Sequence, residues 1–169
     1  MASQIRLQLP EMIGYLAQPS SYGLAGAHTQ KEAGLVGELL LWEGLRRGFS
    51  VLKDGSLRDG EWYAAFITAV RRRHPALRVA LLHMTCLPEM VVARAAKRAE
   101  ATGRVVPPGV LMRAMAEVPR AVAALAPLTD YAVTIDTTCA EPVLASQNLA
   151  VPDGAPLETW DSFAAQWRA

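Results

Sequence analysis

A carboxylate, a hydroxyl and a guanidinium stand close together in the segment Asp54-Gly55-Ser56-Leu57-Arg58-Asp59. The planar fork of Arg58 suits a phosphate or a carboxylate, and a helix expected to begin after Asp59 offers free N–H donors. The segment therefore predicts a site for such an anion. The alternative is a Ser or Asp helix cap beside a surface Arg, because such caps are common.

A second group of cations follows on a predicted helix. Arg94, Lys97 and Arg98 are spaced i, i+3 and i+4, so they project from one side of that helix, and Arg104 follows in a Gly-containing loop. Cations this close need an anion. A ligand phosphate would supply it if these residues formed a lid for phosphoryl transfer, which depends mostly on positioning and charge stabilisation. A solvated face paired with the neighbouring Glu89, Glu100 and Glu117 is the alternative.

Two kinds of binding motif are absent from the printed sequence. It contains no G-x-x-x-x-G-K-[ST] segment, so the loop that cradles nucleotide phosphates in P-loop enzymes is missing together with its Lys. Cys86 and Cys139 form no C-x-x-C pair, and the three histidines form no H-x-x-x-H pair. We therefore expect no structural zinc site and no disulfide framework, and the motifs indicate no metal ligands.

The composition predicts one soluble globular domain. The 169 residues are 51% hydrophobic and 20% charged, which allows a sizeable core and excludes general disorder. A net charge of +1 gives no electrostatic footprint for nucleic acid or an acidic membrane surface. No stretch approaches the roughly 20 apolar residues of a membrane span. We expect a cytoplasmic protein that binds neither nucleic acid nor membrane.

The candidate anion-binding residues are expected to lie on or next to helices. A helix is predicted over 30–47, with Thr29 and Glu32 as a capping box and Gly48 as its stop. Asp59 can cap the next helix, whose three closing arginines complement the helix dipole. The remaining expected helices are a short one within 1–27, one from Pro88 to about Ala101, two short ones split by Pro119, and a last one carrying Trp160, Phe163 and Trp167.

Three apolar segments are predicted to be strands, at 49–52, 78–85 and 131–135, and residues 137–156 are predicted to be irregular. His83 within the second strand is expected to be a core residue. Strands that alternate with helices indicate an α/β fold with a parallel sheet flanked by helices. In such sheets ligands bind beyond the carboxyl ends of the strands, which here are 54–56, 85–86 and 136–137.

These motifs resemble the zeta-toxin family of P-loop kinases, from about Ile5 to Asp136. The Asp54 and Gly103 motifs are the most specific parts. The resembling segments are Ile5-Arg6, Leu9-Pro10-Glu11, His28 to Ala33, Asp54 to Asp59 with Trp62-Tyr63, Arg94 with Lys97-Arg98, Thr102 to Pro107, and Ala126 to Leu128. The resemblance implies a P-loop NTPase-like fold, incomplete here, with a kinase-like domain over 1–136 and a C-terminal segment, 137–169, packed on it.

The resemblance also implies an enzyme that uses ATP and Mg²⁺ to phosphorylate a small hydroxyl-bearing acceptor. Carried over by motif, Asp54, Ser56 and Arg58 would line the acceptor site. Arg94 and Arg104 would hold the ATP phosphates and the transferring group, and Arg98 would support them. We therefore expect the guanidinium groups of Arg58, Arg94 and Arg104 to converge on one anion pocket at the ends of the strands.

The sequence departs from the family at two places. The phosphate loop is missing with the strand that leads into it, and Ser3 stands near the place of the family's general-base carboxylate. In the family that strand lies between those matching 50–53 and 78–85, and its loss would leave a gap of roughly 10 Å.

We expect a fragment of a longer kinase, in which a longer chain supplies the missing strand. Closure of the two flanking strands, or a strand supplied by another segment, is the alternative. A non-catalytic nucleotide- or anion-binding module is the rival function, and a decayed product without a stable fold is a third reading.

Overall fold

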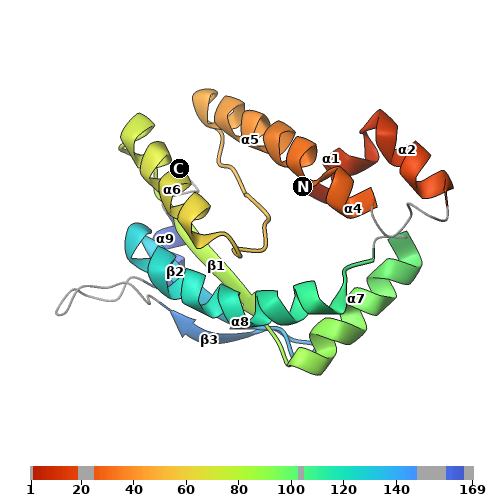
Figure 1. Ribbon diagram of the computed structural model, residues 1–169. Coiled ribbons are helices and arrows are strands. Elements are labelled where there is room, and N and C mark those ends of the chain that lie inside the picture. The colour runs from red at the N-terminus through yellow and green to blue at the C-terminus, as the bar shows by residue number, and fades with distance from the viewer. Residues whose placement is uncertain (1, 19–24, 103–104, 148–158, 166–169) are drawn as a thin grey trace. The chain divides into compact units, whose positions relative to one another are not determined.

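The computed structural model describes residues 2–18, 25–102, 105–147 and 159–165 (Figure 1). The chain divides into two compact units, one made of Met1–Gly55 with Val92–Leu111 and the other of Ser56–Val91 with Met112–Ala169. In the described ranges the first unit is helical, and the second contains the sheet. The boundary expected near residue 136 stays a prediction.

Short helices build the apolar core of the first unit. α1 (Ala2–Leu7), α2 (Pro10–Ala17), α4 (Ala25–His28) and α5 (Gln30–Arg46) follow one another. Pro10 begins α2, where the N–H that it lacks would have no helical acceptor. The helix predicted over 30–47 is confirmed. Where one short helix was expected within 1–27, the described residues form α1 and α2, and α4 begins at Ala25. The buried cluster consists of Ile5, Leu9, Met12, Ala25 and Ala33.

The capping box predicted at the start of α5 is wrong. Thr29 is buried, and its Oγ1 donates to the carbonyl oxygen of Ala25 at 2.8 Å instead of accepting from an N–H of α5. The N–H of Ala33 bonds to the carbonyl of Thr29 at 3.0 Å. The Thr29 hydroxyl therefore ties α5 to the turn before it.

Gly48 ends α5 as predicted, in a Schellman motif. Its φ is +77°, its N–H bonds to the carbonyl of Leu45, and the Phe49 N–H bonds to that of Gly44, both at 3.0 Å. The strand predicted over 49–52 is absent: this segment is irregular, with Phe49 60% and Leu52 73% exposed. A strand forms where a neighbouring strand accepts and donates its backbone hydrogen bonds. In the described part of the chain no strand pairs with residues 49–52.

The sheet of the second unit has the order β1-β2-β3. β1 (Ala80–Thr85) and β2 (Tyr131–Asp136) are parallel, in register from Ala80↔Tyr131 to Thr85↔Asp136, which confirms two predicted strands. β3 (Val143–Gln147) runs antiparallel to β2, so the expectations of an all-parallel sheet and of an irregular 137–156 are wrong. The six residues between β2 and β3 are too few for a crossover, and the chain must return antiparallel.

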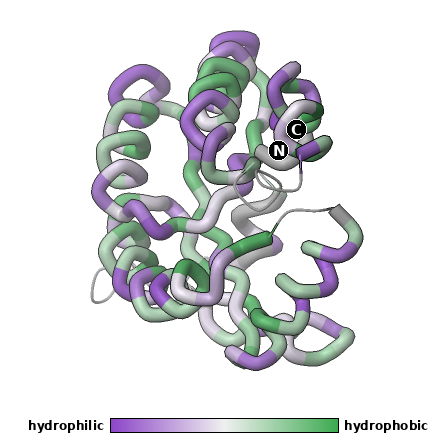
Figure 2. Tube along the Cα trace, turned by 45° about the vertical axis from the view of Figure 1, so that its right-hand side comes forward, coloured by the Kyte–Doolittle hydropathy of each residue, from purple (hydrophilic) through white to green (hydrophobic). Residues whose placement is uncertain are grey.

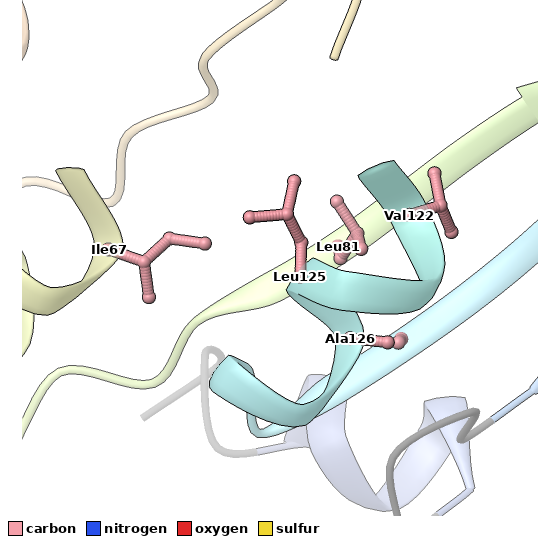
Figure 3. Packing of buried hydrophobic residues seen from close by; sticks show 6 residues of the cluster. Ile67, Leu81, Val122, Leu125 and Ala126 are labelled. Atoms are coloured by element: carbon pink, nitrogen blue, oxygen red, sulfur yellow. The ribbon is translucent and has the colours of Figure 1, made fainter. Parts of the chain in front are cut away.

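Helices α6 (Gly60–Arg73) and α8 (Pro108–Leu125) supply apolar side chains to one face of the sheet. In Figure 3, Ile67 of α6 extends toward Leu125 of α8, and Leu81 of β1 lies beside them. The alternation of purple and green along the helical turns in Figure 2 fits helices with one buried side. The predicted break at Pro119 is wrong, since α8 continues through it. Val118 and Val122, on either side of Pro119 in the sequence, both pack against this core.

Three further elements complete the described chain. α7 (Pro88–Thr102) confirms the helix predicted from Pro88. A short 3-10 turn, η1 (Ala126–Leu128), links α8 to β2. α9 (Trp160–Ala165) is the expected last helix, and Trp167 lies outside the described residues.

Asp130 joins the sheet to α6. Its carboxylate accepts the N–H of Val79 at 2.7 Å and pairs with the Arg71 guanidinium at 3.0 Å. Arg71 Nε also donates to the carbonyl of Leu128 at 2.9 Å. Arg71 is therefore structural, as predicted for the arginines that end α6, and it acts through a specific ion pair in addition to the helix dipole. The same prediction for Arg72 and Arg73 stays a prediction.

Asp130→Ala is expected to lower the free energy of unfolding by about 1–2 kcal/mol, because it leaves the Val79 N–H and a half-buried guanidinium without their acceptor. Urea denaturation followed by circular dichroism measures this. Glu141→Ala, which removes an exposed carboxylate from the same unit, is the control. Equal midpoints for the two variants would contradict the role of Asp130.

Candidate functional site

Leu57 sets the direction of the predicted acceptor residues. Its φ of +55° is in the left-handed region that a branched side chain seldom adopts, and its side chain packs against the core of the second unit. Ser56 and Arg58 on either side are exposed, and Arg58 Nε lies 3.4 Å from Ser56 Oγ. Packing of the partly buried Leu57 against this core therefore leaves a hydroxyl and a guanidinium facing outward, next to each other. Asp54 is exposed too, two residues before Ser56.

Asp59 is the predicted cap of α6. Its Oδ1 accepts from the N–H of Trp62 at 2.9 Å, and its carbonyl accepts from Tyr63 at 3.1 Å. The helix-cap alternative is thus correct for Asp59. It does not account for Ser56 or Arg58, neither of which bonds to the helix N-terminus.

An open hollow of about 480 Å³ lies between the start of α6 and the side of α8. Gly60 makes this approach possible, because a Cβ at Gly60 would stand 3.2 Å from the Cβ of Ala121. Arg113 and Glu117 precede Ala121 by two turns and one turn, so they follow the same side of α8. The hollow is lined by Arg58, Asp59, Gly60, Glu61, Arg113 and Glu117.

Arg113 was not predicted as a site residue, and Glu117 only as a possible neighbour of the α7 cations. The i, i+4 spacing of these two residues was visible in the sequence. Their proximity to Arg58 was not, because it depends on the contact between Gly60 and Ala121, which are 61 positions apart.

The predicted cofactor residues lie on a different element. Arg94 and Arg98 are exposed, one turn apart on α7, and belong to the first unit, whereas Ser56 and Arg58 belong to the second. Arg104 lies outside the described residues. The convergence of Arg58, Arg94 and Arg104 therefore stays a prediction.

The carboxyl ends of β1 and β2 are held by local hydrogen bonds. Thr137 donates to the carbonyl of Thr85 from its N–H at 2.8 Å and from Oγ1 at 3.0 Å. Asp136 Oδ1 accepts the N–H of Thr138 at 2.8 Å. Hydrogen bonds from the Thr138 side chain and backbone lower the pKa of Asp136. These groups shape the turn that follows β2.

Two other polar residues are structural. Half-buried His83 lies with Nδ1 3.3 Å from Thr134 Oγ1, and burial lowers its pKa, which favours a neutral imidazole. Arg6, from the first resembling segment, is only 2% exposed and donates to Gln30 Oε1, and burial lowers its pKa as well. His83 was expected to be a core residue, but it is only half-buried and is not among the buried core residues.

The described residues include side chains suited to the phosphates of the implied ATP but no cluster suited to the implied Mg²⁺. The exposed guanidinium groups of Arg94 and Arg98 suit nucleotide phosphates. For the metal, no group of three His, Cys, Asp or Glu side chains comes together within the described ranges. Cys86 and Cys139 are free thiols. No helix in the described ranges is long and apolar enough to cross a membrane.

Thr138→Val is expected to raise the pKa of Asp136 toward its ordinary value, because one of its two hydrogen bonds is lost. A carboxylate with a lowered pKa stabilises the fold above its unfolded pKa, and this stabilisation disappears as the pH falls through the folded value. An NMR pH titration of the Asp136 carboxyl carbon measures the shift. Thr129→Val removes a hydroxyl that bonds to Ala126 and should leave Asp136 unchanged. An unchanged pKa in Thr138→Val would contradict the assignment.

Comparison with known proteins supports the resemblance drawn from the motifs. No curated protein and no solved structure matches the chain significantly. The family model described as Zeta toxin matches residues 2–143, which is most of the chain and covers Ser56, Arg58, Arg94 and Arg113. The chain therefore belongs to the zeta toxin family, whose members have a P-loop kinase-like domain.

Proposed function

We propose that this chain is the acceptor-binding and phosphate-clamping part of an ATP-dependent small-molecule kinase. The observation that supports it best is the outward pair of Ser56 and Arg58, 3.4 Å apart on either side of the partly buried Leu57. A hydroxyl and a guanidinium at this distance can hold an acceptor by a neutral and a charge-assisted hydrogen bond at once. Asp54, exposed just before them, is proposed as the third acceptor residue.

The nucleotide phosphates are assigned to Arg94, Arg98 and Arg104. Two cations on successive turns of α7 can face adjacent phosphate groups, and a guanidinium can bind two phosphate oxygens at once. In phosphoryl transfer most of the catalysis comes from positioning and from stabilising charge on the phosphoryl oxygens. Bound Mg²⁺ would neutralise part of that charge. We assign no step to the metal, because the described residues offer no cluster for it.

A non-catalytic module that binds nucleotides or other anions is the second candidate. Ser3 near the position of the family's general base favours it, because a hydroxyl accepts a proton from the acceptor far less readily than a carboxylate does. The sequence also lacks a Lys in a phosphate loop. Both candidates use the same arginines, so they differ in turnover and not in binding.

Arg94→Gln is expected to weaken ATP–Mg²⁺ binding about tenfold, because a lost guanidinium–phosphate pair costs about 1.5–3 kcal/mol, of which solvent screening removes part. Titration calorimetry of the printed chain measures it. Arg72→Gln, at an exposed position near the end of α6, should bind as the unaltered protein does.

Transfer of labelled γ-phosphate to a panel of hydroxylated metabolites separates the two candidates. Binding with transfer supports the kinase, and binding without transfer supports the module. Absence of ATP binding by the unaltered chain would contradict the kinase and a nucleotide-binding module. Equal affinities of the Arg94 and Arg72 variants would contradict the assignment of Arg94 to the phosphates.

A further inference from the structure

We propose that Arg113 and Glu117 of α8 are specificity-determining residues of the acceptor pocket, and that the molecule they select carries an anionic group beside its hydroxyls. The inference rests on the proposed function only in naming that molecule an acceptor.

The first argument is geometric. Arg113 and Glu117 line the same hollow as Arg58 and Glu61, and all four belong to the second unit. The contact between Gly60 and Ala121 fixes the distance between the two walls, because a larger residue at either position would push the helices apart. A volume of about 480 Å³ is in the range of small-molecule sites, which hold a ligand of sugar size.

The second argument concerns charged side chains that make no ion pair or hydrogen bond among the described residues. Among the described residues, the side chains of Arg113, Glu117 and Glu61 have no ion pair or hydrogen bond. On α5 the same helical spacing is satisfied internally, since Glu43 binds Arg46 and Arg47 at 2.7 Å. The charges of Arg113, Glu117 and Glu61 are thus open to a ligand.

The third argument is the arrangement of these charges. Each wall contributes one guanidinium and one glutamate, and Asp59 is already engaged by the N–H of Trp62. Two guanidinium groups can share one phosphate or carboxylate, and carboxylates accept hydrogen bonds from hydroxyl groups. A hydroxylated anion can pair with both guanidinium groups and donate hydrogen bonds to both glutamates, whereas an uncharged sugar offers the arginines only hydroxyl oxygens and leaves their charge without a counter-ion.

The test uses NMR signals of ¹⁵N-labelled arginine side chains in the absence of ATP. Glucose 6-phosphate, glucose and inorganic phosphate serve as probes. We expect the Nε–H signals of Arg58 and Arg113 to shift with both phosphates and to stay in place with glucose. Arg113→Gln should weaken glucose 6-phosphate binding tenfold or more, and Arg113→Lys should restore part of the loss because it keeps the charge.

Glu117→Gln distinguishes recognition of hydroxyls from general attraction. It should weaken the binding of glucose 6-phosphate several-fold and leave that of inorganic phosphate unchanged, and Arg72→Gln should change neither. The proposal is overturned if the Arg113 signal moves with neither phosphate, if it moves no more than that of Arg72, or if Arg113→Gln binds normally. Binding through Arg113 without phosphate transfer would support this inference and reject the kinase, so the two proposals fail separately.

Discussion

The packing of α6 and α8 on the parallel pair β1–β2 decides where the candidate acceptor residues stand. Ile67, Leu125 and Leu81 meet in one buried cluster, and Leu57 joins its edge from the segment before α6. Because the Leu57 side chain packs inward, the side chains of Ser56 and Arg58 on either side of it face outward. The positions of the polar site residues therefore depend on the apolar packing next to them. Loss of that packing would separate Ser56 and Arg58 even with both side chains unchanged.

The arginines of this chain fall into groups with different physical roles. Arg71 is paired with Asp130, and Arg46 and Arg47 with Glu43. The pairs on α5 lower the pKa of Glu43 to about 2, although all three side chains are largely exposed. Arg58 and Arg113 instead line an open hollow. Arginine thus has two roles in this chain, as a structural ion-pair partner and as a candidate ligand-binding residue. The presence or absence of a nearby carboxylate partner distinguishes these roles.

Local sequence signals predicted the elements that local interactions stabilise. The cap at Asp59, the stop at Gly48 and the apolar runs of β1 and β2 are visible in a few consecutive residues. The strand expected at 49–52 failed because pairing with another strand decides whether an apolar run becomes a strand. β3 and the continuous α8 were missed for a related reason, since the length of a connection and the packing around Pro119 determine them.

The same rule applies to the residues of the candidate site. Ser56 and Arg58 are neighbours in the sequence, and their exposure beside α6 follows from the pattern around them. Arg113 reaches the same hollow only through the tertiary contact of two helices, which no local pattern reveals. The resemblance to a family added roles for Arg94, Arg98 and Arg104. These roles require the arginines to lie near Ser56 and Arg58, and local sequence signals do not determine that arrangement.

The contact between Gly60 and Ala121 has a consequence for how this surface can evolve. With 3.2 Å between an added Cβ and the Ala121 methyl, the two positions share a fixed volume, and neither can grow unless the helices separate. Among related chains, positions 60 and 121 should therefore covary in size. A lineage that enlarges either one would widen its hollow and admit a bulkier molecule without altering a single charged residue.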